Sequence, residues 1–371
     1  MNIKNQEYLQ NSIIDYLKLL RKDDTNFKYN ISNESNLTRA GALLELGFSC
    51  FALKIKVILN DEDLNAKTTS EWANFINNFQ KNITPFPSAS FVDNYFLNEH
   101  TKFNLNKASK NLIKKTLNKG FGKNYILNKQ QLYSYISAES KQAISTLNEI
   151  GYENKIQYIE FPKTEESIIK YLDSFNWENP WSAGAQFSTL CLFTETQLSD
   201  NVEVKQVLKN YIKTKLDVDT GFYHTKKNIN ENVLINGAMK VLTGLDWIDE
   251  GIHNPEKIVD FVLKSEITNE ACDLVDVVYV LFRCSQQTNY RKLDIINFIN
   301  KVEDVIFKNF IKEEGGFSYS YQKSQKFYYG LIVTKQQKYA DLHGTLLLLW
   351  AYTLILELKN ENNLGWKIIK P

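Results

Sequence analysis

The sequence has little of several features that identify large classes of protein. Its four cysteines are far apart, form no CxxC pair and lie in apolar segments, so we expect buried free thiols rather than a disulfide framework. Positive charge is not in excess either: 44 Lys and Arg stand against 43 Asp and Glu, which leaves a net charge of +1. A dedicated nucleic-acid binder usually has a basic excess or stripe, so no nucleic-acid partner is expected.

Membrane, targeting and common cofactor signals are missing too. The N-terminal segment has a polar residue at every third or fourth position, unlike a signal peptide. The longest apolar run, Leu346–Ile355, is too short to span a bilayer, so we expect a cytoplasmic protein without a transmembrane segment. No Walker loop, GxGxxG, HExxH or GxSxG string occurs, which argues against dinucleotide-dependent and P-loop enzymes and against common hydrolases.

Helices dominate what is present, because apolar residues recur at spacings of three and four in segment after segment. Two kinds of segment alternate along the chain. Mixed, charged segments cover Gln6–Arg21, Ser70–Phe79, Thr164–Phe175, Asn201–Lys215, Pro255–Lys264 and Lys292–Lys312. Segments that are apolar nearly all round, with a more polar second member, cover Thr38–Ile55, Leu132–Ile150, Ser182–Phe193, Val233–Leu245, Asp273–Cys284 and Leu342–Leu356.

This alternation predicts an all-α fold. A helix that is apolar all round must be buried on all sides, and an amphipathic helix can cover it. Six such pairs predict an α6/α6 toroid that forms a single domain over residues 1–371, with an irregular insertion near 83–106 and a connector near 152–162. An open solenoid of helical pairs is the alternative, but it would need a polar cap at each end, and the C-terminal segment shows none.

An internal repeat supports the ring. Two blocks, Lys209–His224 and Phe307–Ser320, each combine an outer helix, acidic residues and a Gly-Phe pair, and each leads into an apolar helix. The Gly allows a turn with positive φ, and the Phe can tuck under the ring. The alignment matches Phe222 with Phe317, Tyr223 with Ser318 and Asn236 with His343.

The Gly-Phe turn followed by a polar-headed apolar helix resembles the repeat of the terpenoid cyclase and protein prenyltransferase α/α toroids. The resemblance covers at best the last 200 or so residues. It implies a reaction inside the ring, but several family motifs are absent: no DxDD motif opens an inner helix, and no DDxxD or Cys-His-Gly string occurs. A prenyltransferase-like toroid would place a zinc-binding Asp-x-Cys near Asp341, where this sequence has His343 in the Cys position. We therefore expect no cofactor and keep zinc or magnesium as an alternative.

The starts of the inner helices should share one rim, where polar residues are candidates for catalysis. Asp341 and His343 open the last inner helix as an Asp-oriented general acid or base, or else as a helix cap and a buried histidine. Asp273 and Asp276 lie one turn apart, so the carboxylates share a face and one pKa rises. The alternative for this pair is a cap with a favourable helix-dipole contact.

Aromatic residues near the Gly-Phe turns and before one inner helix complete the set. Tyr and His share acid–base work in some lyases, and aromatic faces stabilise cations in cyclases, although Tyr and Phe at turns are more often packing residues. Tyr223 and His224 are counted as catalytic candidates. Candidates for substrate binding are Trp177, Trp181, Asn236, Tyr319, Tyr321, Phe222 and Phe317.

Three functions remain open from the sequence. The first is an enzyme that acts on an isoprenoid-like or other hydrophobic substrate by acid-initiated cyclisation or related lyase or isomerase chemistry. The second is a carbohydrate-active toroid, a polysaccharide lyase or glycoside hydrolase, in which Trp177 and Trp181 hold the sugar. The third is a toroid that binds a polymer or partner without catalysis. The partner is a small-molecule or oligomeric substrate in the first two, and the oligomeric state is open.

Overall fold

The computed structural model describes residues 4–23, 27–103, 105–121, 127–226 and 229–371. Within these ranges the chain forms fifteen α-helices, one 3-10 helix (Glu34–Asn36) and six strands of two residues each. The strands make three small antiparallel hairpins and no larger sheet among the described residues. The prediction of an all-α protein is therefore confirmed.

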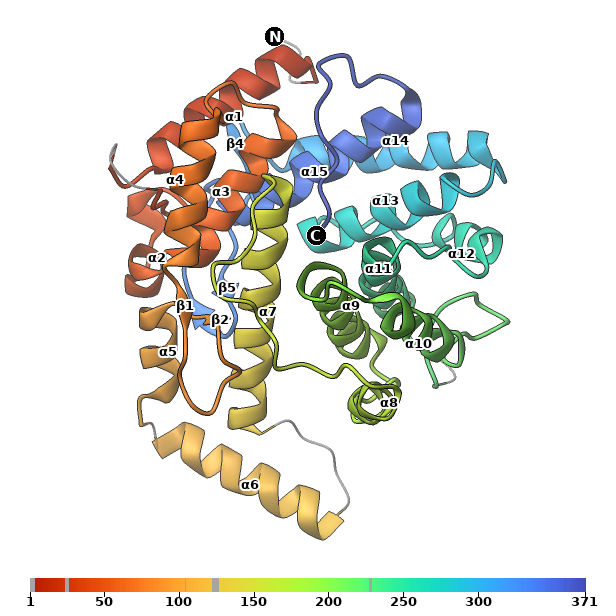
Figure 1. Cartoon of the computed structure of the whole chain (residues 1–371). Helices are drawn as coiled ribbons and strands as arrows, with labels where there is room; N and C mark the ends of the chain where they lie inside the picture. Colours follow the sequence, from red (N-terminus) through yellow and green to blue (C-terminus); the bar gives the residue numbers. More distant parts are fainter. Residues whose placement is uncertain (1–3, 24–26, 104, 122–126, 227–228) are drawn as a thin grey trace.

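Six helices form an inner ring. Each inner helix contacts the next inner helix along the chain, and the last contacts the first. The contacting pairs are α3 with α7, α7 with α9, α9 with α11, α11 with α13, α13 with α15, and α15 with α3. Figure 1 shows them around the middle of the molecule, with the C-terminus among them. The inner helices are α3 (Leu46–Ile58), α7 (Asn128–Glu149), α9 (Pro180–Gln197), α11 (Glu231–Trp247), α13 (Ala271–Ser285) and α15 (Leu342–Lys359).

Amphipathic helices precede these inner helices and cover them. In α12 the buried residues Ile258, Val259 and Val262 lie on one face, which packs on α13, while α14 contacts both α13 and α15. The predicted charged segments all correspond to helices of this outer layer. They are α1 (Gln6–Leu20), α4 (Ala66–Asn77), α8 (Glu165–Asp173), α10 (Val202–Lys213), α12 (Pro255–Val262) and α14 (Lys292–Lys308).

The apolar character of α15 follows from its position in the ring. Leu342–Lys359 is long and apolar enough to cross a membrane by length and composition, but 72% of that window is buried inside the protein. Its two neighbours in the ring and α14 cover it. A helix enclosed in this way has to be apolar nearly all round.

The first inner segment differs from the prediction, which placed one helix over Thr38–Ile55. The structure divides it into α2 (Arg39–Leu43) and α3, with a break at Leu44 and Glu45. The carboxylate of Asp93 accepts hydrogen bonds from the backbone N–H of Glu45 at 2.8 Å and of Leu46 at 3.3 Å. This contact satisfies amide groups at the start of α3, so a residue far along the chain fixes the break.

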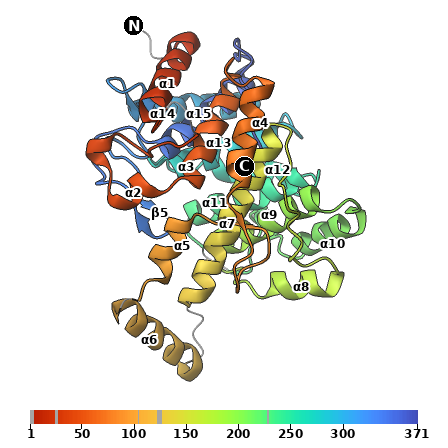
Figure 2. The ribbon, with the colours of Figure 1, turned by 60° about the vertical axis from the view of Figure 1, so that its left-hand side comes forward.

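The insertion is larger than expected. The range near 83–106 contains the helix α5 (Asn94–Thr101), and a further helix, α6 (Leu105–Phe121), follows it without having been predicted. In both views α6 lies apart from the inner ring (Figure 1, Figure 2). Its Leu105 and Leu112 are 74% and 66% exposed, so burial does not explain their apolar character. The connector near 152–162 has no helix or strand.

The repeat is present, but its alignment shifts by one residue. In the first block the N–H of His224 donates to the carbonyl of Lys215, and in the second the N–H of Ser318 donates to that of Asn309. Gly221 and Gly315 occupy the same place in the two turns, with φ of +81° and +82°. The hairpin bonds therefore match Tyr223 with Phe317 and His224 with Ser318, which corrects the predicted pairs Phe222 with Phe317 and Tyr223 with Ser318.

The two hairpins belong to the loops before α11 and α15. In the second, β3 (Phe310–Ile311) pairs with β4 (Gly316–Phe317), and a further hairpin, β5 (Phe327–Tyr328) with β6 (Leu331–Ile332), follows it. The remaining pair of strands, β1 (Gln80–Lys81) and β2 (Ser90–Phe91), forms a hairpin elsewhere in the chain, in the loop after α4. A Cβ on Gly344, in the first turn of α15, would lie 2.6 Å from the backbone nitrogen of Tyr319. The absence of a side chain there lets this loop pack directly on the start of α15.

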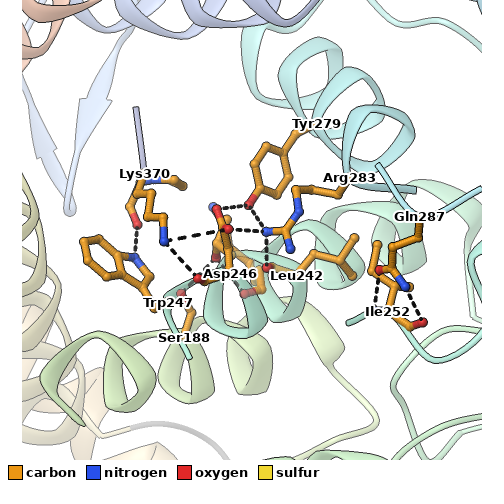
Figure 3. Close-up of polar contacts among 12 residues, drawn as sticks. Ser188, Leu242, Asp246, Trp247, Ile252, Tyr279, Arg283, Gln287 and Lys370 are labelled. Carbon is orange, nitrogen blue, oxygen red and sulfur yellow. Dashed lines mark hydrogen bonds and ion pairs between the residues drawn. The ribbon is translucent and has the colours of Figure 1, made fainter. Parts of the chain in front are cut away.

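The opposite ends of the inner helices are tied together by the C-terminal segment. Lys370 donates to the backbone carbonyl of Asp246 at 3.0 Å, and the Trp247 indole donates to the carbonyl of Pro371 at 3.0 Å. The Asp246 carboxylate also pairs with Arg283 of α13 at 2.8 Å. Figure 3 shows this network, in which every charged group has a partner of opposite charge.

Replacing Asp246 by Ala should strongly destabilise the fold. Arg283 is 9% exposed, so the variant would leave a buried guanidinium without its carboxylate. A loss of roughly 3 kcal/mol is expected in the free energy of unfolding, measured by urea denaturation. The control is Asp260→Ala, which breaks the more exposed Arg291–Asp260 pair at 2.7 Å and should cost about 1 kcal/mol or less. Equal losses in the two variants would contradict this account.

Candidate functional site

A group of polar side chains lies inside the ring, and the electrostatic effect of Lys240 of α11 identifies its members. This helix packs on α9 and α13, yet burial and then the charge of Lys240 lower the pKa of Lys141 on α7 and of His343 on α15. Since α7 and α15 lie one helix beyond those neighbours on either side, the Lys240 side chain points into the interior. We call Lys141, Lys240, Cys272, Asp276, Tyr319 and His343 the interior cluster; all of them except Asp276 keep partial solvent exposure.

Asp276 comes from the inward face of α13. The helical spacing of four and three places Cys272, Asp276 and Tyr279 on one face, and Cys272 and Asp276 both lie within range of the Lys240 charge. Asp276 is 3% exposed, and its carboxyl makes no hydrogen bond to another residue in the described part of the chain. Burial, opposed by the charge of Lys240 and reinforced by that of Asp273, raises the pKa of this carboxyl to about 7. Asp276 is therefore half protonated near neutral pH.

His343 lies between two aromatic rings. Its imidazole stacks on Phe51 of α3, with ring centres 4.7 Å apart and planes 8° apart, and on Tyr319 at 5.6 Å. Burial, followed by the charge of Lys240, lowers the pKa of His343 to about 3. Its Nδ1 is buried and has no hydrogen-bond partner among the described residues. His343 is thus neutral at physiological pH, and can donate or accept a hydrogen bond but is no cationic acid.

Tyr319 and Cys272 form a second polar contact inside the ring. The Tyr319 hydroxyl donates to the Cys272 sulfur at 2.9 Å. Burial raises the pKa of the thiol to about 11 and raises that of the phenol as well, so neither group ionises near neutral pH. The contact fixes the Tyr319 ring against His343 and contributes no charge to the interior.

Asp341 is a helix cap and does not orient His343, which corrects the predicted acid–base pair. Its carboxylate accepts three backbone N–H groups, from Gly344 at 2.7 Å and from Tyr319 and Gln325 at 2.9 Å. Burial still raises its pKa to about 7, against the lowering effect of these bonds. With both oxygens engaged by the backbone, Asp341 holds the loop before α15 onto the helix start.

Asp273 lies at the rim, outside the interior cluster. It accepts hydrogen bonds from Asn236 at 3.0 Å and from Thr268 at 3.0 Å. Asp273 and Asn236 line a small pocket of about 10 Å³ between α11 and α13, which is room for about one water molecule. Asn236 is the sixth residue of α11 whereas His343 is the second of α15, so the two do not occupy the same step of their helices.

The aromatic candidates of the first block and of the segment before α9 belong to the outer layer. Tyr223 is 1% exposed, and its hydroxyl bonds His253 in the loop after α11, far along the helix from its start. His224 contacts Thr220 of its own loop at 3.3 Å. The Trp177 indole is buried and donates to the carbonyl of Leu172, while Trp181 is 51% exposed.

The other aromatic candidates also lie away from the interior cluster. Phe222 packs on Phe261 of α12, and Phe317 packs on Phe310 of its own hairpin. Tyr321 is 49% exposed. Of the thirteen predicted site residues, the structure thus brings together Asp276, His343 and Tyr319.

The interior cluster also contains residues that the sequence analysis missed. Lys141 and Lys240 lie one turn or more inside their helices, whereas only helix starts were considered. A usable signal was present: Lys240 is the one charged residue in the apolar stretch 232–245. A lone lysine in a helix that is buried nearly all round is seldom tolerated without a purpose.

Comparisons with known proteins give little further guidance. No family model matches the chain, and no similar protein is found among curated proteins. Among solved structures, the chain is similar to a type II terpene cyclase from Scytonema in complex with its product, merosterolic acid A. That match covers 96% of this chain and 99% of the other, with a TM-score of 0.41 and 10% sequence identity. At this level the likeness carries no argument about function, which has to rest on the interior cluster.

The raised pKa of Asp276 predicts a pH-dependent stability. The folded chain holds the proton up to about pH 7, whereas an unfolded aspartate loses it near pH 3.9. Stability that depends on this proton is present below the unfolded pKa and is lost as the pH rises to the folded pKa. Asp276→Asn, which cannot ionise, should therefore be more stable than the wild type at pH 8, by on the order of 1–3 kcal/mol, with a smaller gain at pH 5.

Urea denaturation at the two pH values measures this difference. Asp260→Asn serves as the control, since a hydrogen bond from Arg291 lowers the pKa of that carboxyl and its loss should bring no gain at pH 8. A gain for Asp276→Asn that is the same at pH 5 and pH 8 would show that the carboxyl does not titrate between them.

Proposed function

We propose that the inner ring and its outer helices form an α6/α6 toroid and that the protein is an enzyme of lyase or isomerase type. It acts inside the ring on a largely apolar substrate, and Asp276 transfers the proton. The observation that carries this proposal is the Asp276 carboxyl, which is buried inside the ring, bears no hydrogen bond from a described residue and has a pKa of about 7.

A purely structural carboxyl would not be left in this state. Burial of a charged group is costly unless hydrogen bonds or an ion pair compensate it, as they do for Asp246 at the other end of the ring. A catalytic carboxyl, by contrast, benefits from a pKa close to the working pH, because both protonation states are then populated and proton transfer in either direction is accessible. The environment of Asp276 fits the second case.

The walls around Asp276 indicate the kind of substrate. Phe51, His343 and Tyr319 form a stack, and none of the three bears a charge at neutral pH. Such a surface suits an apolar or unsaturated body, held by packing and oriented by the few polar atoms nearby. His343, with its unpartnered Nδ1, is placed to accept or donate a hydrogen bond to a polar atom of that substrate.

The acidity of Asp276 narrows the reaction. A carboxyl with a pKa of about 7 can protonate a leaving oxygen or an enol carbon, and as carboxylate it can remove a proton next to a carbonyl group. Acid-initiated cyclisation of an isoprenoid-like alkene, which the resemblance implies, is the more demanding case because an alkene is a much weaker base. We therefore favour proton transfer at an activated carbon or oxygen.

The alternatives have less support. The sugar-binding function needs Trp177 and Trp181 side by side on an open groove, but Trp177 is 4% exposed, with its indole bonded to Leu172. A module that binds without catalysis gives no reason for an unpartnered carboxyl among the described residues inside the ring. Neither alternative uses Asp276.

The proposal is tested by turnover in heavy water. The wild-type protein, incubated with a small-molecule extract of the source cells in D2O, should consume one compound and form a product that carries solvent deuterium at the new C–H or O–H position, measured by mass spectrometry. Asp276→Asn should slow this conversion by roughly 100-fold or more, the range expected for loss of general acid–base catalysis.

Asp260→Asn, on the outer helix α12, is the matched control and should convert the compound at the wild-type rate. Conversion by Asp276→Asn at the wild-type rate would remove the basis of the proposal. A wild-type protein that converts nothing, in an extract from which it retains a compound, would favour the binding module instead.

A further inference from the structure

Two lysines of the interior cluster have no anionic partner. The Lys141 ammonium donates one hydrogen bond, to Ser188 Oγ at 2.9 Å, and Lys240 makes no side-chain hydrogen bond to a residue that the structure describes. No described carboxylate oxygen lies within 4.0 Å of either nitrogen. When both amines are protonated, five of their six N–H groups therefore lack a protein acceptor in the described part of the chain.

The two charges also repel each other. Burial, together with the neighbouring charges of Lys240 and Lys54, lowers the pKa of Lys141 to about 7. Asp276 lies within range of the Lys240 charge, but near neutral pH Asp276 and Lys141 are each about half ionised, so their charges offset each other and the charge of Lys240 remains. The Lys54 ammonium donates its hydrogen bonds to the Ser145 hydroxyl and to the carbonyl of Lys370. The groups of the interior cluster thus carry an excess of positive charge near neutral pH.

A chain of hydroxyl groups holds Lys141 in place. Thr243 donates its hydrogen to the carbonyl of Lys240 at 2.8 Å, so its oxygen is left to accept from Ser188, 2.9 Å away. Ser188 has then used its own hydrogen and can only accept from Lys141. This chain crosses from α7 through α9 to α11. It fixes the direction of the Lys141 side chain and leaves its other N–H groups available.

We propose that Lys141 and Lys240 form an anion-binding subsite inside the ring, for a carboxylate or phosphate group of a ligand whose apolar body lies against Phe51, Tyr319 and His343. Two ammonium groups that face one space without a counter-ion are stabilised by a ligand that brings the missing charge. The charge of Lys240 affects both Lys141 and His343, so the lysines and the aromatic stack lie in the same part of the interior. One ligand molecule can therefore place its anionic head group at the lysines and its apolar body against the stack. This inference deepens the proposed function by naming an anionic amphiphile as its substrate class.

Direct binding tests the subsite without reference to turnover. Octyl phosphate, octanoate and 1-octanol have the same chain and differ in the head group, and their affinities can be measured by isothermal titration calorimetry below the micellar range. The wild-type protein should bind at least one of the two anions roughly tenfold more tightly than the alcohol. The comparison of octyl phosphate with octanoate shows which head group is preferred.

Substitutions then assign the preference to the two lysines. Lys141→Met and Lys240→Met should each remove most of the tenfold preference while leaving the affinity for 1-octanol within about twofold. Lys141→Arg, which keeps the charge, should retain it, and Lys170→Met on the outer helix α8 should change nothing. Asp276→Asn should keep the preference for the anion. The proposal of an anion subsite can therefore be contradicted without contradicting the proposal of proton transfer by Asp276, and the reverse also holds.

Thermal unfolding of the wild-type protein tests the subsite even if one of the substituted variants does not fold. In the wild type, octyl phosphate or octanoate should raise Tm more than 1-octanol does at equal concentration, and 0.5 M NaCl should reduce that difference. Equal affinity of the wild type for the two anions and the alcohol would overturn the proposal. So would an anion preference that survives both methionine substitutions.

Discussion

The closure of the inner ring is the constraint on which the rest of the structure depends. Each inner helix contacts the next, and α15 contacts α3, so every inner helix presents one face to its two neighbours and the outer layer and another to a common interior. A polar residue on that inward face is largely surrounded by the other inner helices. It has to find its partners among the inward faces of the other five helices, which is why Lys240 acts on residues of α7, α13 and α15.

Charged residues are compensated at the ends of the inner helices but not further inside the ring. At the ends of the inner helices the charges are compensated: Asp246 pairs with Arg283 and lies within 3.9 Å of Lys370, and the C-terminal segment packs over them. Further inside the ring, Lys141, the fourteenth of the 22 residues of α7, and Asp276, the sixth residue of α13, remain without an ion pair among the described residues. Compensated charge is what a fold requires, whereas uncompensated charge lowers stability and is retained where a ligand or a reaction uses it.

Much of this fold could be read from the sequence, because the distinction between helices that are apolar all round and helices with one apolar face is local. The failures have non-local causes. The break before α3 depends on Asp93, which lies 48 residues further on than Glu45. The shift of the repeat by one residue depends on the hairpin bond between Ser318 and Asn309, and a Gly-Phe string alone does not reveal it.

The candidate site could be predicted only in part from the sequence, again because some of the contacts that define it are non-local. Asp276 is conspicuous in the sequence, since a carboxylate inside an apolar helix needs an explanation. Asp341 is conspicuous as well, but only the structure shows that the backbone N–H groups of Tyr319 and Gln325, from a loop that precedes it, occupy its oxygens. Lys141 and Lys240 lie inside their helices, whereas the argument from a shared rim predicts site residues only at helix starts. Their significance lies in sharing the interior, where the charge of Lys240 acts on Lys141, and the sequence does not report which side chains share a space.

The central claim is that the Asp276 carboxyl is held inside the ring with a pKa near neutrality. The most direct measurement is a pH titration of the carboxyl carbon by NMR in protein labelled with ¹³C at aspartate, with the signal assigned by its absence in Asp276→Asn. The account predicts a midpoint near pH 7, because burial outweighs the charge of Lys240. A midpoint near pH 4, the value of an ordinary solvated aspartate, would contradict it.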